Sequence, residues 1–319
     1  MAGVPWGTAG RTPEEGAAII PRLGETAALG TALVWAFTAI FFSLASARIG
    51  AVTVNRTRLV LAVLLLGATR WILEGAPLPT AASPRAWFWL GLSGLVGLTL
   101  GDTFLFQALV DLGPRKAMLV MSSWPIFSSL LGLAFLGESL RMLEVAGIAA
   151  TLGGIAWVVA EKEAVPAALS RPEHLARGLL CAFGGALCQA AGIVAAKEGL
   201  REGLSSLSGT LIRMLVAAAG LWLVTLLMGG AVQSLRKLSD RRALLFTACG
   251  AVTGPFIGVW LSLVAVNHAK VGVASALMAL VPVLMLPLVR AIFHEKISPR
   301  ALLGTLAAFA GVVLLLIEN

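Results

Sequence analysis

Long apolar stretches separated by short polar clusters run through the chain from residue 27 onward. A helix that crosses a bilayer needs roughly 20 mostly apolar residues, whereas a membrane β-strand needs about 10 residues of alternating polarity. The stretches have the helical length and lack the alternation, so they predict an all-α membrane protein with ten transmembrane helices. The ten stretches lie at about residues 27–47, 52–73, 86–110, 117–137, 143–160, 177–197, 206–228, 243–267, 271–293 and 301–317.

Composition supports a membrane protein. Of the 319 residues, 58% are hydrophobic and only 13% are charged, whereas a soluble domain has about 25% charged residues. Residues 1–25 are more polar, and we interpret them as a tail rather than a cleavable signal peptide. The partners expected from this composition are a small-molecule substrate and membrane lipid.

The net charge of +8 does not predict nucleic-acid binding, because no basic stripe with interleaved aromatic residues is present. We assign the excess to loops near anionic lipid. Cys181, Cys188 and Cys249 are too few and too poorly spaced for a disulfide framework or a zinc site, and we expect them to pack as small apolar residues. We therefore expect no metal and no cofactor.

The chain is a tandem repeat with a shift of 157 residues. Pro125 then aligns with Pro282, and Glu138 aligns with Glu295, so that both halves share the same proline-to-glutamate spacing. Further aligned pairs are Gly97 with Gly254, Gly101 with Gly258, Ala108 with Ala265, Ala117 with Ala274, Met121 with Met278, Gly147 with Gly304, and Gly154 with Gly311.

Each repeat contains five predicted helices, and we place the repeats at residues 26–162 and 175–319. An odd number of crossings inverts the second unit relative to the first, a construction shared by many secondary transporters. Ten crossings also place both chain ends on one side of the membrane. The predicted fold is therefore two inverted five-helix repeats.

Small residues repeat every four positions on the third and eighth predicted helices. This spacing makes a flat ridge on which another helix can pack closely. The ridges are Ser93, Gly97 and Gly101 in the first repeat, and Gly250, Gly254 and Gly258 in the second. They predict that the two helices occupy equivalent interior positions.

Pro125 and Pro282 lie near the middle of the fourth and ninth predicted helices. Each removes one backbone hydrogen bond and frees the carbonyl four residues earlier, at Met121 or Met278. The prolines are either structural kinks or kinks that flank a cavity and help to gate it.

Several segments resemble the drug/metabolite transporter superfamily, and specifically its ten-helix EamA type. The resemblance covers all of the chain except the N-terminal tail. The segments that carry it in the first half are "TRLVLA" (57–62), "GDTFLFQALVDLGPRKA" (101–117), "SSWPIFSSLLGLAFLGESL" (122–140) and "GIAATLGGIAWVV" (147–159). Their counterparts are "IRMLVA" (212–217), "ALMALVPVLMLPLVRAIFHEKIS" (275–298) and "GTLAAFAGVVLLL" (304–316).

The resemblance implies a central cavity and secondary transport, often export, of small metabolites such as amino acids or related polar compounds. It also implies residence in a plasma membrane, which we expect to be the bacterial inner membrane. Trp35 lies where the family has Trp-Gly, although Ala36 replaces the glycine, and Gln189 stands opposite Trp35 in the second half. Glu138 and Glu295 lie at helix ends, where we expect caps or loop anchors rather than substrate ligands.

Asp102 is a full negative charge inside an apolar stretch, and a charge within a membrane helix indicates either a functional site or a structural pair. At 1.5 Å per residue, Asp102 lies roughly 12 Å from the end of its helix and Arg58 roughly 9 Å into the preceding helix, at the same membrane face. We therefore predict an Asp102–Arg58 pair. The pair either has a structural role or couples substrate or protons to transport. The alternative to a pair is that Asp102 faces water in a vestibule.

Arg213 is the counterpart of Arg58, or of Arg56 without a gap, but Val259 stands opposite Asp102. Arg213 has therefore lost the equivalent acid. It either pairs with Glu198 or remains available to an anionic, carboxylate-bearing substrate.

Large aromatic residues with a few polar groups are typical of small-molecule cavities, although each alone is more often a packing residue. Lys197 and Asn267 lie at helix ends, and His268 and His294 fall in loops rather than in a metal pair. The candidate cavity residues are Trp35, Arg58, Asp102, Met121, Trp124, Pro125, Gln189, Arg213, Trp260, Met278 and Pro282.

Charge distribution conflicts with the orientation that the resemblance implies. With cytoplasmic chain ends, eight Lys or Arg residues fall inside and thirteen outside, whereas positive charge normally concentrates inside. We keep the family orientation as the expectation.

The leading function is secondary transport, by a monomer or homodimer. The alternatives are a membrane-embedded enzyme and a non-transporting scaffold or receptor. The sequence contains no HExxH, GxSxG or GxxxxGK[ST] motif, which argues against an enzyme and against ATP-driven transport. A proton gradient is a candidate energy source.

Overall fold

The computed structural model describes residues 22–112, 120–160, 175–284, 288 and 299–317, where all the regular structure is helical. Within these residues, six segments are long and apolar enough to cross a membrane: Leu23–Ser46, Val52–Glu74, Pro84–Leu105, Leu175–Leu200, Ser206–Leu227 and Arg241–His268. Four shorter apolar segments are Trp124–Leu136, Met142–Trp157, Val271–Leu284 and Leu302–Leu315. Each of these segments overlaps one of the stretches predicted from the hydrophobic pattern, and the four shorter ones cover only part of theirs.

The first half contains α2 (Leu23–Ile49), α3 (Ala51–Glu74), α4 (Pro84–Ser93), η1 (Gly94–Gly101), α5 (Asp102–Leu112), α7 (Trp124–Leu131), η2 (Gly132–Leu136) and α8 (Met142–Ala160). The second half contains α9 (Leu175–Leu200), α10 (Ser206–Leu227), α11 (Ala231–Lys237), α12 (Arg241–Ala251), η5 (Val252–Gly258), α13 (Val259–His268), α14 (Val271–Met278) and α16 (Pro299–Ile317). The η elements are π-helical turns within otherwise α-helical segments.

Helix ends follow local capping chemistry. The Ser83 hydroxyl accepts a hydrogen bond from the Ala86 N–H, and Pro84 occupies the first turn of α4, where its missing N–H costs nothing. The Ser205 hydroxyl caps α10 in the same way through the Ser208 N–H. Gly75 ends α3 with a φ of 76°, a left-handed conformation that favours glycine.

Asp240 caps α12 and joins it to α2. Its carboxylate accepts hydrogen bonds from the backbone N–H groups of Ala243 (3.0 Å) and Arg242 (3.1 Å) and from Arg48 Nε (2.8 Å). The Ala243 N–H, followed by the Arg48 guanidinium, lowers the pKa of the Asp240 carboxyl below its usual range. A lowered folded-state pKa favours the folded protein above the pKa of the unfolded chain.

We therefore expect the stability difference between the protein and its Asp240→Asn variant to depend on pH. It should be present above about pH 4 and should decline as the pH falls through the lowered pKa, because both caps are then uncharged. Thermal unfolding across this range measures it. A difference that grew on acidification would contradict this assignment.

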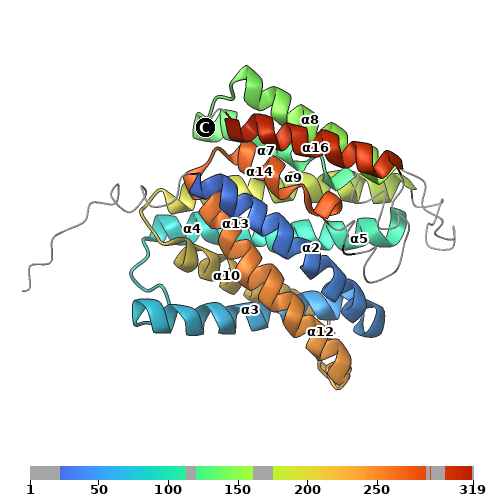
Figure 1. Ribbon diagram of the computed structural model, residues 1–319. Helices are drawn as coiled ribbons and strands as arrows, with labels where there is room; N and C mark the ends of the chain where they lie inside the picture. The colour runs from blue at the N-terminus through green and yellow to red at the C-terminus, as the bar shows by residue number, and fades with distance from the viewer. Residues whose placement is uncertain (1–21, 113–119, 161–174, 285–287, 289–298, 318–319) are drawn as a thin grey trace, which may run out of the picture.

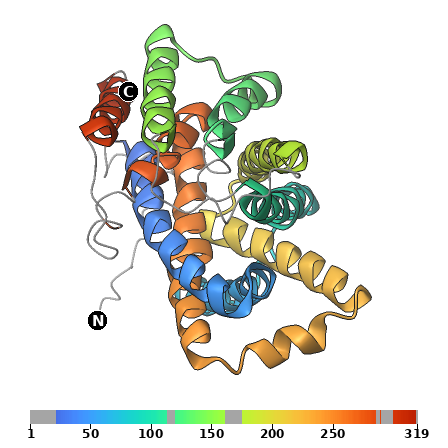
Figure 2. The same cartoon turned by 90° about the vertical axis from the view of Figure 1, so that its right-hand side faces the viewer.

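Glycines make the interface between α8 and α16, which lie side by side along one edge of the molecule (Figures 1 and 2). A Cβ atom at Gly147 would lie 3.0 Å from the Gly311 oxygen, and one at Gly154 would lie 2.5 Å from the Gly304 oxygen. In the repeat alignment, Gly147 corresponds to Gly304 and Gly311 corresponds to Gly154. The Gly147–Gly311 contact is therefore the repeat counterpart of the Gly154–Gly304 contact.

The predicted small-residue ridges are confirmed as close packing surfaces. The α4–η1–α5 segment packs on α9, where a Cβ at Gly192 would lie only 2.8 Å from the Gly97 Cα. The α12–η5–α13 segment packs on α2, where a Cβ at Gly254 would lie 2.6 Å from the Thr38 Cγ2. Small residues permit this backbone approach. The third predicted helix therefore packs on the sixth, and the eighth packs on the first.

Other pairs of helices also join the two halves. The α3 helix packs on α10, and α7 packs on α14. At the start of α10, Arg70 Nε donates to the Ser208 hydroxyl (2.9 Å) and forms an ion pair with Glu74 (3.0 Å). In each of the helix pairs described above, a helix of one repeat packs against a helix of the other. The repeats are therefore interleaved rather than separate bundles.

Candidate functional site

The predicted Arg58–Asp102 ion pair is confirmed. Arg58 Nη2 on α3 donates to Asp102 Oδ2 at the junction of η1 and α5. Arg58 Nε also donates to Asn55 Oδ1 (2.7 Å), and the guanidinium lies 5.3 Å from the centre of the Phe42 ring. Both charged side chains are mostly buried, with 13% and 15% of their surface exposed. The charge of Arg58 is therefore neutralised and held in place by three neighbours.

Asn55 and Phe42 were not predicted as part of this site. Asn55 precedes Arg58 by three residues on α3, so the two side chains share one helix face. That spacing was available in the sequence. Phe42 lies on a different helix, α2, and nothing in its local sequence indicates the contact.

The expected Arg213–Glu198 pair is wrong. Glu198 lies near the end of α9, where it binds Arg85 (2.8 Å) and Arg201 (2.8 Å). Arg213 is the eighth residue of α10 and therefore lies about 10 Å below the start of that helix. It is 3% exposed, and its Nε and Nη1 have no hydrogen-bond partner among the described residues.

Three candidate residues surround the junction of η1 and α5. Asp102 begins α5, and the Met121 sulfur lies 3.1 Å from the position of a Cβ on Gly185 of α9. The Gln189 backbone nitrogen lies 3.7 Å from the position of a Cβ on Gly101. Asp102, Met121 and the Gln189 backbone therefore lie around the place where η1 and α5 pack on α9, an interface lined by Gly101 and Gly185.

Trp35 and Trp260 belong to the corresponding contact in the second half. Trp35 on α2 packs against Gly258, whose Cβ would lie 2.6 Å from the indole Cδ1. Trp260 is two residues further along α13 and contacts the Phe256 ring, with 6.3 Å between ring centres. Both tryptophans are partly buried packing residues of the main core.

Two π-helical turns coincide with these contacts, and the sequence analysis did not predict them. The η1 turn ends at Gly101 and η5 ends at Gly258, two residues that are repeat counterparts. A π-turn accommodates an extra residue and frequently marks a functional position. Within a uniformly apolar, glycine-rich run, one extra residue per turn leaves no signal in the hydrophobic pattern.

The chain is interrupted, rather than merely kinked, at the two predicted prolines. The fourth helix contains a turn at residues 122–123, and Pro125 occupies the first turn of α7 instead of a helix interior. The ninth has its turn at residues 279–280, before Pro282. The Ser123 N–H to Val120 oxygen bond recurs 157 residues later as the Leu280 N–H to Leu277 oxygen bond.

Side chains at these interruptions are well covered. Trp124 is 7% exposed and Met278 is 1% exposed. Both belong to the main hydrophobic core. The structure thus supports packing roles for both side chains.

An open groove of about 320 Å³ is lined by none of the candidate residues. Its lining includes Val63, Leu64 and Trp71 on α3 and Leu211 on α10. The lining is apolar, and Leu64 and Trp71 are more than 60% exposed. Such a surface suits contact with lipid acyl chains.

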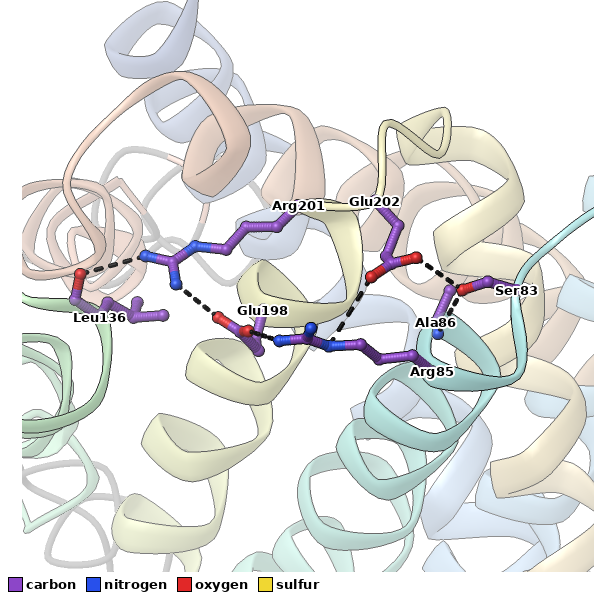
Figure 3. A network of polar contacts seen from close by, with 7 residues as sticks. All are labelled: Ser83, Arg85, Ala86, Leu136, Glu198, Arg201 and Glu202. Atoms are coloured by element: carbon purple, nitrogen blue, oxygen red, sulfur yellow. Dashed lines mark hydrogen bonds and ion pairs between the residues drawn. The ribbon is translucent and has the colours of Figure 1, made fainter.

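Ion pairs connect helix ends and the adjoining loops at one end of the molecule. Figure 3 shows Glu198 between Arg85 and Arg201, with Arg85 also directed toward Glu202. The Glu202 carboxylate accepts a hydrogen bond from the Ser83 hydroxyl (2.9 Å). Several helix ends are therefore tied together at this end.

Glu138 lies at the same end and confirms its predicted role as an anchor. Its carboxylate accepts hydrogen bonds from the Val271 N–H (2.7 Å), at the first residue of α14, and from Lys197 Nζ (2.6 Å). The positive end of α14 and the Lys197 ammonium both favour this negative charge. Lys270 forms a second link with the buried Glu144 (2.6 Å). Glu295 and His294 lie outside the described residues.

Nothing in the described part of the chain forms a metal site: no three His, Cys, Asp or Glu residues cluster there. Cys181, Cys188 and Cys249 are free and partly buried. His268 is the last residue of α13 rather than part of a loop.

Comparison with known proteins gives a family and a fold. The sequence profile of the EamA-like transporter family matches residues 22–160 and 176–317. No curated protein matches the chain. Of 29 matching chains in solved structures, one described as "Crystal structure of protein" has a TM-score of 0.72 at 20% identity, and the match covers 91% of this chain and 95% of that one.

Proposed function

Because the chain belongs to the EamA-like transporter family, we propose that it is a secondary transporter that exports small metabolites by alternating access. Amino acids and related polar compounds are the proposed cargo. The family and the apolar helices make it a transmembrane transporter of small molecules in a lipid environment. The proposed location is the bacterial inner membrane.

The observation that carries alternating access is the exchange of contacts between repeats. Gly147 contacts Gly311 and Gly154 contacts Gly304, which is the pattern expected of two units related by a two-fold axis. The matching turns before Pro125 and Pro282 support the same relation. We propose that the chain crosses the membrane ten times as two inverted repeats. If the two repeats exchange their conformations, the binding site opens to the opposite side of the membrane, which gives the two states of alternating access.

The ion-paired end of the molecule supports a closed gate at that end. Glu138 follows η2 in the first repeat, whereas Val271 and Lys197 belong to the second. Glu144 and Lys270 likewise join the two repeats. Opening a path between the repeats at this end would require these contacts to break. We propose that they hold the closed state, and that breaking them opens the gate.

Transport assays on the purified protein in proteoliposomes test the proposed function. We expect at least one amino acid or related metabolite from a radiolabelled panel to cross the membrane, with a rate that responds to an imposed proton gradient. Protein-free liposomes are the control. If no compound in the panel crosses faster than in the control, the proposal fails.

The Glu138→Gln variant tests the proposed gate. Glutamine keeps the size of the side chain but removes its charge, and each charge-assisted bond contributes about 1.5–3 kcal/mol. We expect hydrogen exchange at the first turn of α14 to accelerate by roughly tenfold to a hundredfold. The Glu202→Gln variant, at the same end but without a contact to α14, should leave this exchange unchanged. Equal exchange in the two variants would remove Glu138 from the gate.

A further inference from the structure

The Arg213 guanidinium is a buried cation without a counter-ion among the residues that the structure describes. Its Nη2 lies 3.6 Å from the position of a Cβ on Gly97, and Gly97 in turn packs on Gly192. The side chain thus reaches the contact between η1 and α9, deep in the bundle. Its Nε and Nη1 lack hydrogen-bond partners there. Burying an unpaired charge costs several kcal/mol, so this arrangement calls for an anion.

The acids around α10 do not supply that anion. Glu74 on α3 pairs with Arg70, and Glu198 on α9 pairs with Arg85 and Arg201. Asp102, at the far end of η1, pairs with Arg58. Each of these carboxylates already faces a cation. Among the residues that the structure describes, the positive charge of Arg213 at this interior contact therefore has no compensating carboxylate.

We infer that Arg213 binds the carboxylate of the transported molecule, an inference that rests on the proposed function. A guanidinium donates hydrogen bonds in the planar geometry that a carboxylate accepts. One positive charge is neutralised by a monoanion, whereas a phosphate dianion would leave excess negative charge in an apolar interior. Gly97 and Gly192, which lie beside the guanidinium, bring no charged side chain to this contact. The substrate class is therefore a compound that carries one carboxylate, as the proposed amino acids do.

The asymmetry between the repeats follows from this assignment. Asp102 occupies Arg58 in the first repeat, and its counterpart Val259 leaves the second repeat without an acid. In the first repeat, Asp102 neutralises the Arg58 guanidinium permanently. In the second repeat, the substrate carboxylate neutralises the Arg213 guanidinium. One carboxylate per transport cycle is the expected stoichiometry.

Ligand-induced thermal stabilisation of the purified protein tests the inference directly. The probes are acetate, butyrate, benzoate and 3-phenylpropionate, each compared with its amide, together with inorganic phosphate. We expect at least one acid to raise the unfolding temperature, while its amide and phosphate do not. The Arg213→Gln variant should bind that acid roughly tenfold to a hundredfold more weakly. Arg236→Gln, an exposed change on α11, should bind it normally.

The ligand-free variants separate a binding role from a structural one. Because Arg213→Gln removes an unpaired buried charge, we expect its ligand-free unfolding temperature to equal or exceed that of the parent protein. A lower unfolding temperature with acid binding retained would overturn the inference. Arg213→Lys, which keeps the charge but loses the planar geometry, should bind the acid with intermediate strength.

Transport data distinguish failure of this inference from failure of the proposed function. If metabolites without a carboxylate cross the membrane and carboxylate-bearing compounds neither cross nor compete, the protein is a transporter and the Arg213 assignment is wrong. If acids stabilise the protein through Arg213 but nothing crosses, the site exists and the transport proposal is wrong. If no probe acid stabilises the protein, the inference is overturned.

Discussion

Replacing Asp102 by leucine should destabilise the protein by about 3 kcal/mol. Arg58 would then be a mostly buried cation without its acid, and removal of one partner from a buried pair is far more costly than removal of both. The small residual exposure of the two side chains, 13% and 15%, places the expected effect at the lower end of the range for such pairs. Thermal unfolding followed by tryptophan fluorescence measures it.

The double variant Arg58→Met with Asp102→Leu should recover most of this loss. It removes both charges and leaves apolar side chains in an apolar setting. Arg48→Gln is a suitable control, because Arg48 belongs to an exposed pair with Asp240 and should cost less than about 1 kcal/mol. If the double variant is no more stable than Asp102→Leu alone, the unpaired charge of Arg58 is not the main cause of the lost stability.

The same double variant decides between the two roles left open for the pair. If the pair is structural, restored stability should bring restored transport with an unchanged response to a proton gradient. If Asp102 carries a proton during transport, the restored fold should transport without that response. Stability and proton dependence thus report on different properties of the same two residues.

Depth along a helix explains which pairs could be predicted from sequence. Arg58 and Asp102 lie at similar depths from one membrane face, and counting residues was enough to bring them together. The same count separates Arg213 from Glu198, because Glu198 is near a helix end and Arg213 is about 10 Å inside. Glu198 instead binds Arg85 and Arg201, which lie at its own depth.

Backbone irregularities were harder to predict than helix positions. The hydrophobic stretches predict where helices lie because the bilayer requires a minimum apolar length. They do not distinguish an α-turn from a π-turn, so η1 and η5 left no signal. The turn at residues 122–123 did leave one, since a proline such as Pro125 favours the first turn of a helix over its interior.

The Gly154→Ala variant should be destabilised by about 1–3 kcal/mol, because it adds a methyl group to the tight α8–α16 interface. The new Cβ would lie 2.5 Å from the Gly304 oxygen and 2.8 Å from the Ala308 Cα. Both are backbone atoms, so the helices must separate. Gly153→Ala is a control on the neighbouring residue, where a Cβ meets nothing within 4 Å. It should be neutral or stabilising by up to about 1 kcal/mol.

The repeat relation makes a second claim about this interface. Gly311 is the counterpart of Gly154, and its Cβ would lie 2.5 Å from the Thr151 nitrogen and 2.6 Å from the Gly147 oxygen. Gly311→Ala should therefore lower the unfolding temperature about as much as Gly154→Ala. Because the clash at Gly154 involves main-chain atoms, adding Ala308→Gly to Gly154→Ala should not restore stability. Equal unfolding temperatures for Gly154→Ala and Gly153→Ala would show that glycine packing does not determine how closely α8 and α16 approach.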